Sequence, residues 1–423
     1  MAVIKPFRGI RYNPDLIKDL AAVITPPYDV INPAAQEKLH KNSIYNIIRL
    51  EFGRSKPDDN ESENRYTRAS KTISHWLQEN VLMIENSFSY YFYEQRFLFN
   101  ETEYRRRGLI AALRLEEYSS RIILPHELTM SGPKKDRLEL LSSCHTNISP
   151  IFTLFPDHDC KIANIYDSIE NETLLFDIKE DSGQSHRVWQ ITNPGLQDQL
   201  TANIANQLLL IADGHHRYET ALNYLNQSED RRHTGAGYIL AVLVSMKDPG
   251  LLMLPTHRLL SSMNDRQMDT LLKLIKENFL VIDHGNPRSL NHDFYLNELK
   301  SRADQCCIGF LAAEKACLLI PIKSAAGSDL PVSILHEHLL KPVFEDSIST
   351  AGAEEIIGFS HQFSSTLQAV IDKTADAAFI LDTIPVGDVL DRALSDRVMP
   401  QKSTYFYPKL PSGLILHHHD LSH

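Results

Sequence analysis

Hydrophobic residues follow two kinds of pattern along the chain: short apolar or aromatic runs typical of strands, and apolar residues repeated at helical spacing. Tyr238–Met246 (YILAVLVSM) is continuously apolar, which is typical of a strand buried on both faces. Ser87–Phe97 is aromatic-rich, and Arg107–Leu115 follows it after a polar turn, so these two segments predict a β-hairpin. Arg65–Asn80 and Met268–Phe279 instead carry apolar residues at helical spacing. The mixture predicts an α/β (mixed α+β) fold.

Shorter patterns predict the remaining elements. Further strands are expected at residues 46–50, 122–124, 149–155, 173–178, 186–191, 207–211, 307–311, 317–322 and 377–381. Further helices are expected to begin at Pro33 and Pro194, and to cover 159–169, 218–225, 333–340 and 386–393. We expect residues 251–258 to pair with the strand at 238–246, Arg105–Arg107 to form an exposed strand edge, and His417–His419 to be a solvated tail.

Length and the change of pattern near residue 262 predict several domains. A chain of 423 residues is expected to form two or three. We divide it into an N-terminal α/β region (1–118), a core (119–260) and a C-terminal α/β region (261–423). There is no internal repeat.

Composition narrows the function classes. A formal net charge of -11 disfavours a broad nucleic-acid surface, because phosphate contacts need clustered Lys and Arg. The five cysteines include no CxxC pair, which disfavours a disulfide framework or a structural zinc site. The sequence has no signal-peptide pattern and no run near the ~18 apolar residues of a membrane span, so we expect a cytoplasmic protein that does not contact membranes.

The densest chemistry lies at Asp213–Arg217, between an apolar run and a helical pattern. A strand that turns at Asp213-Gly214 and opens a helix presents unpaired N–H groups, which favour an anion. His215, His216 and Arg217 add further donors on the same turn. The structural alternative is a capped strand–helix junction whose side chains bond local carbonyls.

Three other segments carry candidate residues. His126-Glu127 follows a short apolar strand and a proline. Lys134 and Arg137 lie where Pro133 favours the first turn of a helix, so they are candidates for phosphate contacts or simply a solvated turn. Tyr28-Asp29 follows two prolines, which fix an extended segment, and the structural alternative is an ordinary loop.

Five motifs together resemble one bacterial and archaeal family, catalogued as domain of unknown function 1015. They are PPYDVI at 26–31, LPHE at 124–127, SGPKKDR at 131–137, ADGHHRYETA at 212–221 and KSTYFYPKL at 402–410. The resemblance covers nearly the whole chain, but that family name implies no activity.

Asp213–Arg217 also resembles the DGHTR-type motif of the free serine kinases, which have a ParB/sulfiredoxin-like fold. That resemblance covers roughly residues 120–230 and implies a ParB/sulfiredoxin-like nucleotide-binding catalytic core at 119–260. It implies that the motif holds nucleotide phosphates and that Glu127, in the upstream His126-Glu127 pair, is the general base. His216 replaces the threonine, and the longer spacing between the two motifs requires an insertion.

Together these features predict a nucleotide-dependent phosphotransferase for a small hydroxylated metabolite, with free L-serine as one candidate. Glu127, His126 and Asp213 are the expected catalytic residues, and ATP or ADP with Mg²⁺ the expected cofactors, with Asp213 orienting the metal. Phosphates are assigned to Gly214, His215, His216, Arg217, Lys134 and Arg137, and the acceptor to Tyr28 and Asp29. A homodimer is a candidate assembly.

Two alternatives remain open. One is a nucleotide-binding or hydrolysing regulatory protein of ParB-like type, although that class calls for a basic helix-turn-helix region. The other is a metal-dependent hydrolase using His215, His216 and Asp213, although adjacent histidines rarely converge on one ion. No GxxxxGK[ST] P-loop and no GxGxxG occur, so nucleotide binding depends on Asp213–Arg217. A cysteine is missing from that turn, which disfavours sulfiredoxin chemistry.

Overall fold

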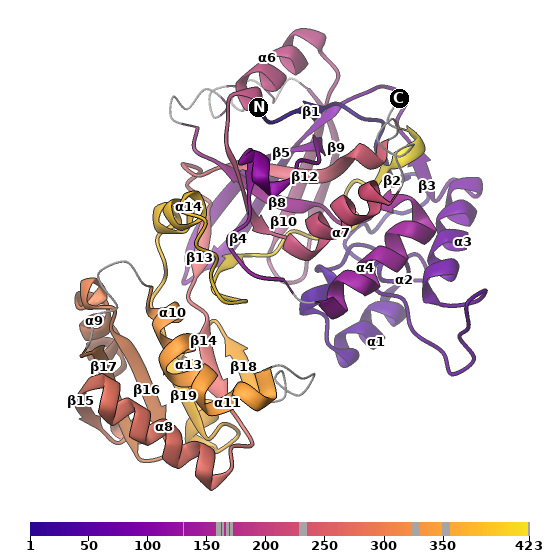
Figure 1. The fold of residues 1–423 in the computed structure, drawn as a ribbon. Helices are drawn as coiled ribbons and strands as arrows, with labels where there is room; N and C mark the ends of the chain where they lie inside the picture. Colours follow the sequence, from indigo (N-terminus) through magenta and orange to yellow (C-terminus); the bar gives the residue numbers. More distant parts are fainter. Residues whose placement is uncertain are drawn as a thin grey trace. The chain divides into compact units, whose positions relative to one another are not determined.

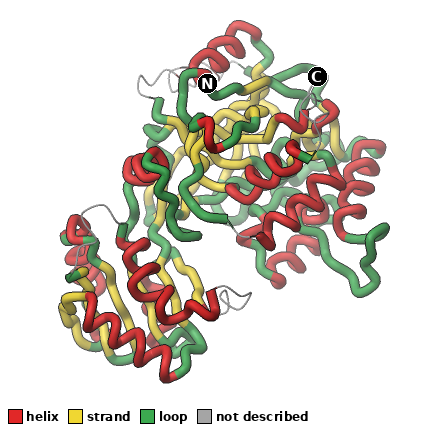
Figure 2. Tube along the Cα trace, in the orientation of Figure 1, coloured by secondary structure: helices red, strands yellow, loops and turns green. Residues whose placement is uncertain are grey.

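The computed structural model of the chain describes every residue except 130, 158–161, 163–164, 166–168, 170–171, 228–234, 323–329, 349–355 and 422–423. It forms two compact units. Unit 1 contains Met1–Leu252 together with Pro408–His423, and unit 2 contains Met253–Tyr407. The C-terminal segment of the chain therefore belongs to the same unit as its N-terminal half. Helices and strands are mixed throughout, which confirms the predicted α/β class (Figure 1; Figure 2).

Unit 1 is built on a nine-stranded mixed sheet with the order β6-β11-β8-β12-β5-β4-β10-β9, and β1 also pairs with β5. Its strands are β1 (Ile4–Lys5), β4 (Tyr90–Phe99), β5 (Thr102–Arg114), β6 (Ile123–Leu124), β8 (Ile151–Phe155), β9 (Thr173–Lys179), β10 (Ser185–Ile191), β11 (Leu209–Asp213) and β12 (Tyr238–Ser245). Most pairs are antiparallel, but β6–β11 and β8–β12 are parallel. The sheet takes strands from both 1–118 and 119–260, so these two sequence regions share one core.

The hairpin predicted from its aromatic residues is confirmed. β4 and β5 pair from Tyr91↔Ile110 to Phe99↔Thr102, and the turn between them places Asn100 and Glu101 at positive φ. Central burial explains the apolar run of β12, which lies between β8 and β5.

The helices of unit 1 pack around this sheet and form a second core. They are α1 (Pro33–Asn42), α2 (Ile48–Glu51), α3 (Arg65–Gln78), α4 (Ser131–Cys144), α6 (Pro194–Ala205) and α7 (His215–Asn226), with a 3₁₀ turn at Tyr28–Val30. α3, α4 and α7 lie side by side (Figure 1). The second core joins α2, α3 and α4 to the small sheet of β2 (Ile10–Tyr12) and β3 (Leu82–Ile84), whereas α7 packs in the core of the large sheet. Trp76 is its largest side chain.

The C-terminal segment is an integral part of unit 1. β21 (His417–His418) pairs with β7 (Thr146–Asn147), and the backbones of Ser412 and Leu416 bond to Thr25 and Ile10. His417 is only 1% exposed, and its Nδ1 lies 3.0 Å from Asn147 Oδ1. The prediction of a solvated histidine tail is therefore wrong, because this segment fills a place in the core.

Three other local predictions are wrong. Residues 48–50 lie in helix α2 instead of a strand, and the Asn46 side chain accepts a hydrogen bond from Ile48 N at 2.9 Å just before it. Residues 251–258 do not pair with β12: β13 (Leu252–Leu254) pairs with β20 (Tyr405–Tyr407), and β14 (His257–Leu260) belongs to unit 2. Arg106 is 1% exposed, so the arginine triplet is not an exposed edge. The helix expected at 159–169 lies mostly outside the described residues.

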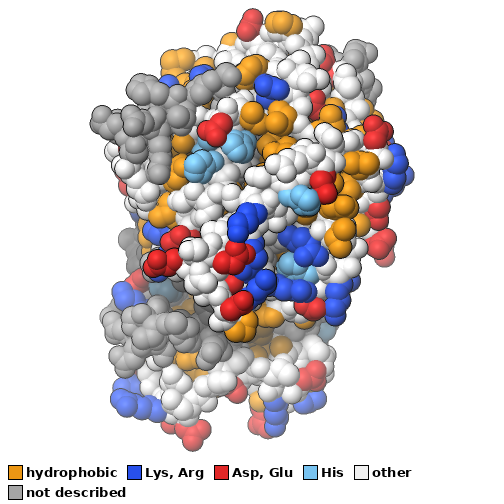
Figure 3. All heavy atoms as spheres, turned by 90° about the vertical axis from the view of Figure 1, so that its right-hand side faces the viewer, with side chains coloured by type: hydrophobic (Ala, Val, Ile, Leu, Met, Phe, Trp, Pro, Cys, Tyr) orange, Lys and Arg blue, Asp and Glu red, His pale blue; other side chains and the backbone are white. Residues whose placement is uncertain are grey.

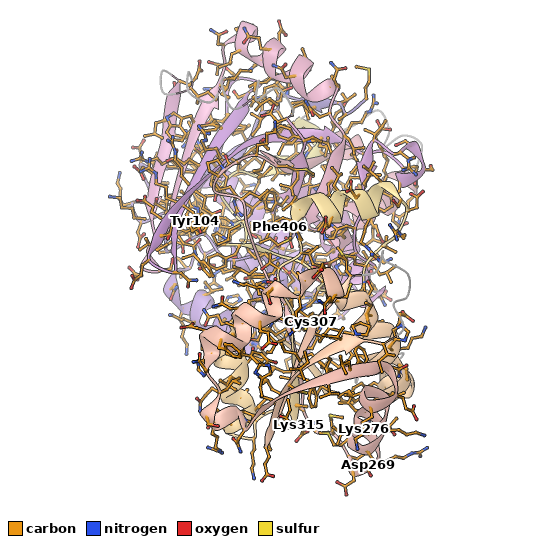
Figure 4. All side chains as sticks on the ribbon, turned by 90° about the vertical axis from the view of Figure 1, so that its left-hand side faces the viewer. Tyr104, Asp269, Lys276, Cys307, Lys315 and Phe406 are labelled. Carbon is orange, nitrogen blue, oxygen red and sulfur yellow. The ribbon has the colours of Figure 1, made fainter. Side chains whose placement is uncertain are left out.

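Unit 2 is a six-stranded antiparallel sheet with the order β15-β17-β16-β19-β14-β18. Its other strands are β15 (Phe279–Gly285), β16 (Ile308–Ala312), β17 (Lys315–Pro321), β18 (Ile357–Ser360) and β19 (Ala377–Ile380). Its helices are α8 (Asp265–Asn278), α9 (His292–Ser301), α10 (Pro331–Leu335), a π-helical turn (His336–Leu340), α11 (Lys341–Ile348), α13 (Phe363–Ile371) and α14 (Val386–Leu394). Cys307 lies inside this unit, whereas Asp269 and Lys276 of α8 are exposed (Figure 4).

In the part of the chain that the structure describes, no helix combines the length and the apolarity that a bilayer span requires.

Candidate functional site

The predicted strand–turn–helix is present at Asp213–Arg217. Asp213 ends β11, Gly214 has φ +94°, and α7 begins at His215. Glycine is required here, since a Cβ would lie 2.9 Å from Ile151 Cγ2 and 3.1 Å from Arg217 Nε. Gly214 has no side chain and so provides no side-chain cap to the first turn of α7.

Asp213 is bonded through both carboxylate oxygens. Oδ2 accepts a hydrogen bond from Arg217 Nη2 at 2.9 Å, and Oδ1 accepts one from Lys409 Nζ. Burial acts to raise the pKa of Asp213, but Lys409 and Arg217 outweigh it and hold the pKa below its usual value. Asp213 is therefore an anionic anchor for two cations.

This pairing does not fit the prediction that Asp213 orients Mg²⁺. A metal at either oxygen would have to share that oxygen with Lys409 or Arg217, whose positive charges would repel it. Within the described residues, no three His, Cys, Asp or Glu side chains are grouped closely enough to hold a metal ion.

The His126-Glu127 pair lies directly beside this turn. β6 runs parallel to β11 with Leu124 opposite Leu210, which carries the chain on to His126 next to the end of β11. His126 Nδ1 donates to the carbonyl of Ile211 at 2.7 Å, and the His126 backbone N–H donates to His215 Nε2 at 3.3 Å. The two imidazoles meet edge to face, with ring centroids 4.6 Å apart.

Glu127 is more exposed than its neighbour in this pair. His126 is fully buried, whereas the side chain of Glu127 is 15% exposed. Glu127 Oε1 lies 3.6 Å from His126 Nε2. Because His126 Nδ1 donates to a carbonyl, its Nε2 is the ring nitrogen nearer to the Glu127 carboxylate.

The two adjacent histidines have different environments. Burial, and then the neighbouring His126, lower the pKa of His215 to about 3, so His215 is neutral and its Nε2 is an acceptor. His216 is half-buried, and burial lowers its pKa, although Glu219 and Asp29 oppose the shift. Asp29 acts electrostatically on His216, so the Tyr28-Asp29 loop lies near the start of α7.

Lys134 and Arg137 both lie on α4 but differ in access. Lys134 Nζ bonds to Glu219 Oε2 at 3.0 Å and to Thr129 Oγ1 at 3.1 Å, and its side chain is 37% exposed. Lys134 is thus reachable beside the first turns of α7.

Arg137 is instead 6% exposed and lies between the carboxylates of Asp136 and Glu51. Its guanidinium stacks on the ring of Tyr28, with Cζ 4.0 Å from the ring centroid. Burial raises the pKa of Tyr28 to about 12, so its hydroxyl keeps its proton at neutral pH. This environment does not fit the prediction that Arg137 contacts phosphate. Arg137 instead fixes the Tyr28 loop.

Arg217 connects the turn to this buried layer. Its Nη1 bonds to the carbonyl of Pro150, and its side chain lines a cavity of about 40 Å³ together with Glu51, Arg137 and Ser149. Ser149 Oγ donates to Glu51 Oε1 at 2.9 Å. The cavity is too small for a nucleotide base, and Arg217 is held beside it by Pro150 and Asp213.

Most of the predicted site residues therefore converge, and residues that sequence reasoning did not assign join them. Asp213–Arg217, His126, Glu127, Lys134 and Asp29 surround the start of α7, while Arg137 and Tyr28 support it. Lys409 and Glu219 were missed. Lys409 had a signal, because it lies in the KSTYFYPKL motif. On the face that includes α3, α4 and α7, basic, acidic and histidine side chains gather close together (Figure 3).

Comparisons with known proteins give a family and distant structural likenesses. The family model described as "Protein of unknown function (DUF1015)" matches residues 4–341. No curated protein matches the chain.

Among solved structures, a conserved hypothetical protein from Pyrococcus furiosus is 14% identical, with a TM-score of 0.38, covering 72% of this chain and 93% of that one. A free serine kinase in complex with AMP is 13% identical, with a TM-score of 0.38, covering 73% and 92%. A C-terminally truncated SbnI from Staphylococcus aureus is 8% identical, with a TM-score of 0.35, covering 71% and 84%. Likenesses this distant say nothing about activity, and the ParB/sulfiredoxin-like assignment of the core stays a prediction.

Proposed function

We propose that this chain, which belongs to the DUF1015 family, is a nucleotide-dependent phosphotransferase acting on a small hydroxylated metabolite. One observation carries the proposal: the start of α7 and the His126-Glu127 pair are joined by the hydrogen bond from His126 N to His215 Nε2, 3.3 Å long. A place for phosphates and a carboxylate able to take a proton are thus held in fixed relation.

The phosphate-binding part is the first turn of α7. Its leading N–H groups, at His215, His216 and Arg217, follow a glycine with no side chain, and the helix dipole adds positive potential there. Lys134 lies beside this turn, and the guanidinium of Arg217 is held against Asp213. Positioning and charge neutralisation are what phosphoryl transfer chiefly requires.

The acceptor part is Glu127, which follows His126 in the chain, and the backbone N–H and ring of His126 are bonded to His215 and Ile211. As the acceptor hydroxyl attacks the terminal phosphorus, its proton moves to the Glu127 carboxylate and the bond from phosphorus to the leaving phosphate oxygen breaks. The nucleotide then departs with one phosphoryl group fewer. His126 is a positioning residue, because it acts through Glu127. We assign Tyr28 and Asp29 to the acceptor side, since Asp29 acts electrostatically on His216.

A transfer assay tests the proposal. Purified protein is incubated with ATP or ADP, with Mg²⁺ varied from zero, and with a panel of amino acids and other small alcohols, and phosphorylated product is followed by ³¹P NMR. Free L-serine is the first acceptor to test, because the DGHTR-type resemblance implies it. We expect an acceptor-dependent phosphomonoester. Calorimetry showing no nucleotide binding would refute the proposal.

The Glu127→Gln variant tests the general base. We expect its turnover to fall by about 10²–10⁴-fold while nucleotide affinity is retained, because the amide keeps the shape and loses the base. The matched control is Glu139→Gln, an exposed residue of α4, which should keep full turnover. Unchanged turnover in Glu127→Gln would remove the assigned base. Hydrolysis of the nucleotide at a rate that does not depend on any acceptor would favour a hydrolase instead.

A further inference from the structure

We propose that Lys409 binds phosphate at this site, so that the C-terminal segment completes a pocket begun by α7. The inference rests on the proposed function only for the identity of the ligand, a polyphosphate. It concerns a residue that reaches Asp213 from 196 positions further along the chain.

The segment that carries Lys409 is held by hydrogen bonds on both sides of the residue. The carbonyl of Pro408 accepts a hydrogen bond from Arg106 Nη2 at 2.6 Å, and the carbonyl of Lys409 accepts one from Gln95 Nε2 at 3.5 Å. Further on, Ser412 and Thr25 exchange two backbone hydrogen bonds. The lysine is therefore presented from a held backbone, and its side chain is only 14% exposed.

Charge around Asp213 is unbalanced. Lys409 and Arg217 bond to its carboxylate, and the buried Arg106 also feels its charge. Burial lowers the pKa of Arg106 to about 10, which leaves it cationic at neutral pH. Asp248, which lies 3.6 Å from Arg107 Nε through its Oδ2, acts on Arg106 more strongly than Asp213 does, so the imbalance at Asp213 concerns Lys409 and Arg217.

Among the described residues, two cations, Lys409 and Arg217, thus share the one carboxylate of Asp213 in a largely buried place. Keeping charge of one sign away from water is costly unless a counter-charge is present. A polyphosphate supplies such a counter-charge, and it would meet cations whose positions Asp213 has already fixed. Asp213 is then a positioning residue, whereas Lys409, a compact ammonium with three donors, is the group that touches phosphate.

Binding of inorganic pyrophosphate, measured by calorimetry, tests Lys409 without a nucleotide or an acceptor. We expect Lys409→Met to weaken binding by about 10- to 100-fold, since it removes one charged hydrogen-bond donor. Lys409→Arg, which keeps the charge, should restore most of the affinity. The matched control is Lys179→Met, an exposed lysine of β9, which should bind as the unchanged protein does.

A second pair of variants covers the case in which Lys409→Met does not fold. Asp213→Asn is compared with the double variant Asp213→Asn/Lys409→Gln. Because the Asp213 carboxylate is already removed in both, the loss of Lys409 does not leave an unpaired buried charge. A further drop in pyrophosphate affinity in the double variant supports the role of Lys409. Equal affinities within either pair, or no pyrophosphate binding by the unchanged protein, overturn it. Lysine-dependent pyrophosphate binding without phosphoryl transfer would refute only the proposed function.

Discussion

Replacing Gly214 by alanine tests the geometry of the strand–helix turn most directly. Alanine would have to adopt φ +94°, a left-handed conformation that costs an L-residue about 1–2 kcal/mol. Its Cβ would also lie 2.9 Å from Ile151 Cγ2 and 3.1 Å from two guanidinium nitrogens of Arg217. Overpacking of this kind costs about 1–3 kcal/mol, so we expect Gly214→Ala to lose about 2–5 kcal/mol of unfolding free energy.

Gly183 provides the matched control, because it isolates the backbone contribution. Its φ is +85°, and no heavy atom of the described residues lies within 4 Å of the position where a Cβ would be. Gly183→Ala should therefore lose only about 1–2 kcal/mol. Urea denaturation of both variants gives the difference, which reports the contact of the new methyl group with Ile151 and Arg217.

Pyrophosphate binding provides a second measurement on the same two variants. Gly214→Ala should also bind pyrophosphate more weakly, because the methyl group pushes Arg217 away from Asp213, whereas Gly183→Ala should bind normally. Equal losses of stability in the two variants, with unchanged binding, would show that the close approach at Gly214 has no energetic weight and would refute this reasoning.

Two further predictions concern buried charge. Burial holds the pKa of His215 and His417 at about 3, below the ~6.5 of an unfolded chain, so the unfolded state takes up more protons as pH falls below about 6.5. Each histidine kept neutral should lower the unfolding free energy by about 1.4 kcal/mol at pH 5.5, compared with its value well above pH 6.5. Urea denaturation at several pH values should therefore show a weaker pH dependence for His417→Asn than for the unchanged protein. Arg137→Met should cost about 3–5 kcal/mol by leaving Glu51 charged and buried, and most of that loss should return in Arg137→Met/Glu51→Gln; denaturation curves that fail to recover would contradict the assigned pair.

Local patterns were sufficient for much of unit 1. The β4–β5 hairpin and the turn at Asp213–Arg217 were predicted because periodicity, turn residues and helix signals act over a few neighbouring positions. The parallel pairing of β6 with β11, which brings Glu127 to this turn, was not readable from either strand alone. Only the motif resemblance linked the two segments beforehand.

Features that depend on distant partners could not be read from the sequence in this way. Arg106 belongs to a basic triplet that looks exposed, yet it is buried against the carbonyl of Pro408. His417 stands in a polar run, yet it packs beside Asn147. In both cases the C-terminal segment supplies the burial, and no periodicity along the chain encodes which segment will cover which.

The large sequence separation of Asp213 and Lys409 also affects when their ion pair can form during synthesis. Ribosomes lengthen a chain by about 5–20 residues per second, and 196 positions separate the two residues, so Asp213 precedes its lysine by roughly 10–40 s. All of unit 2 is synthesised in that interval. A nascent chain can have its strand–helix turn while Asp213 still lacks one of its two cations. Translation that stops early therefore releases proteins that contain every motif up to ADGHHRYETA but lack the Asp213–Lys409 ion pair.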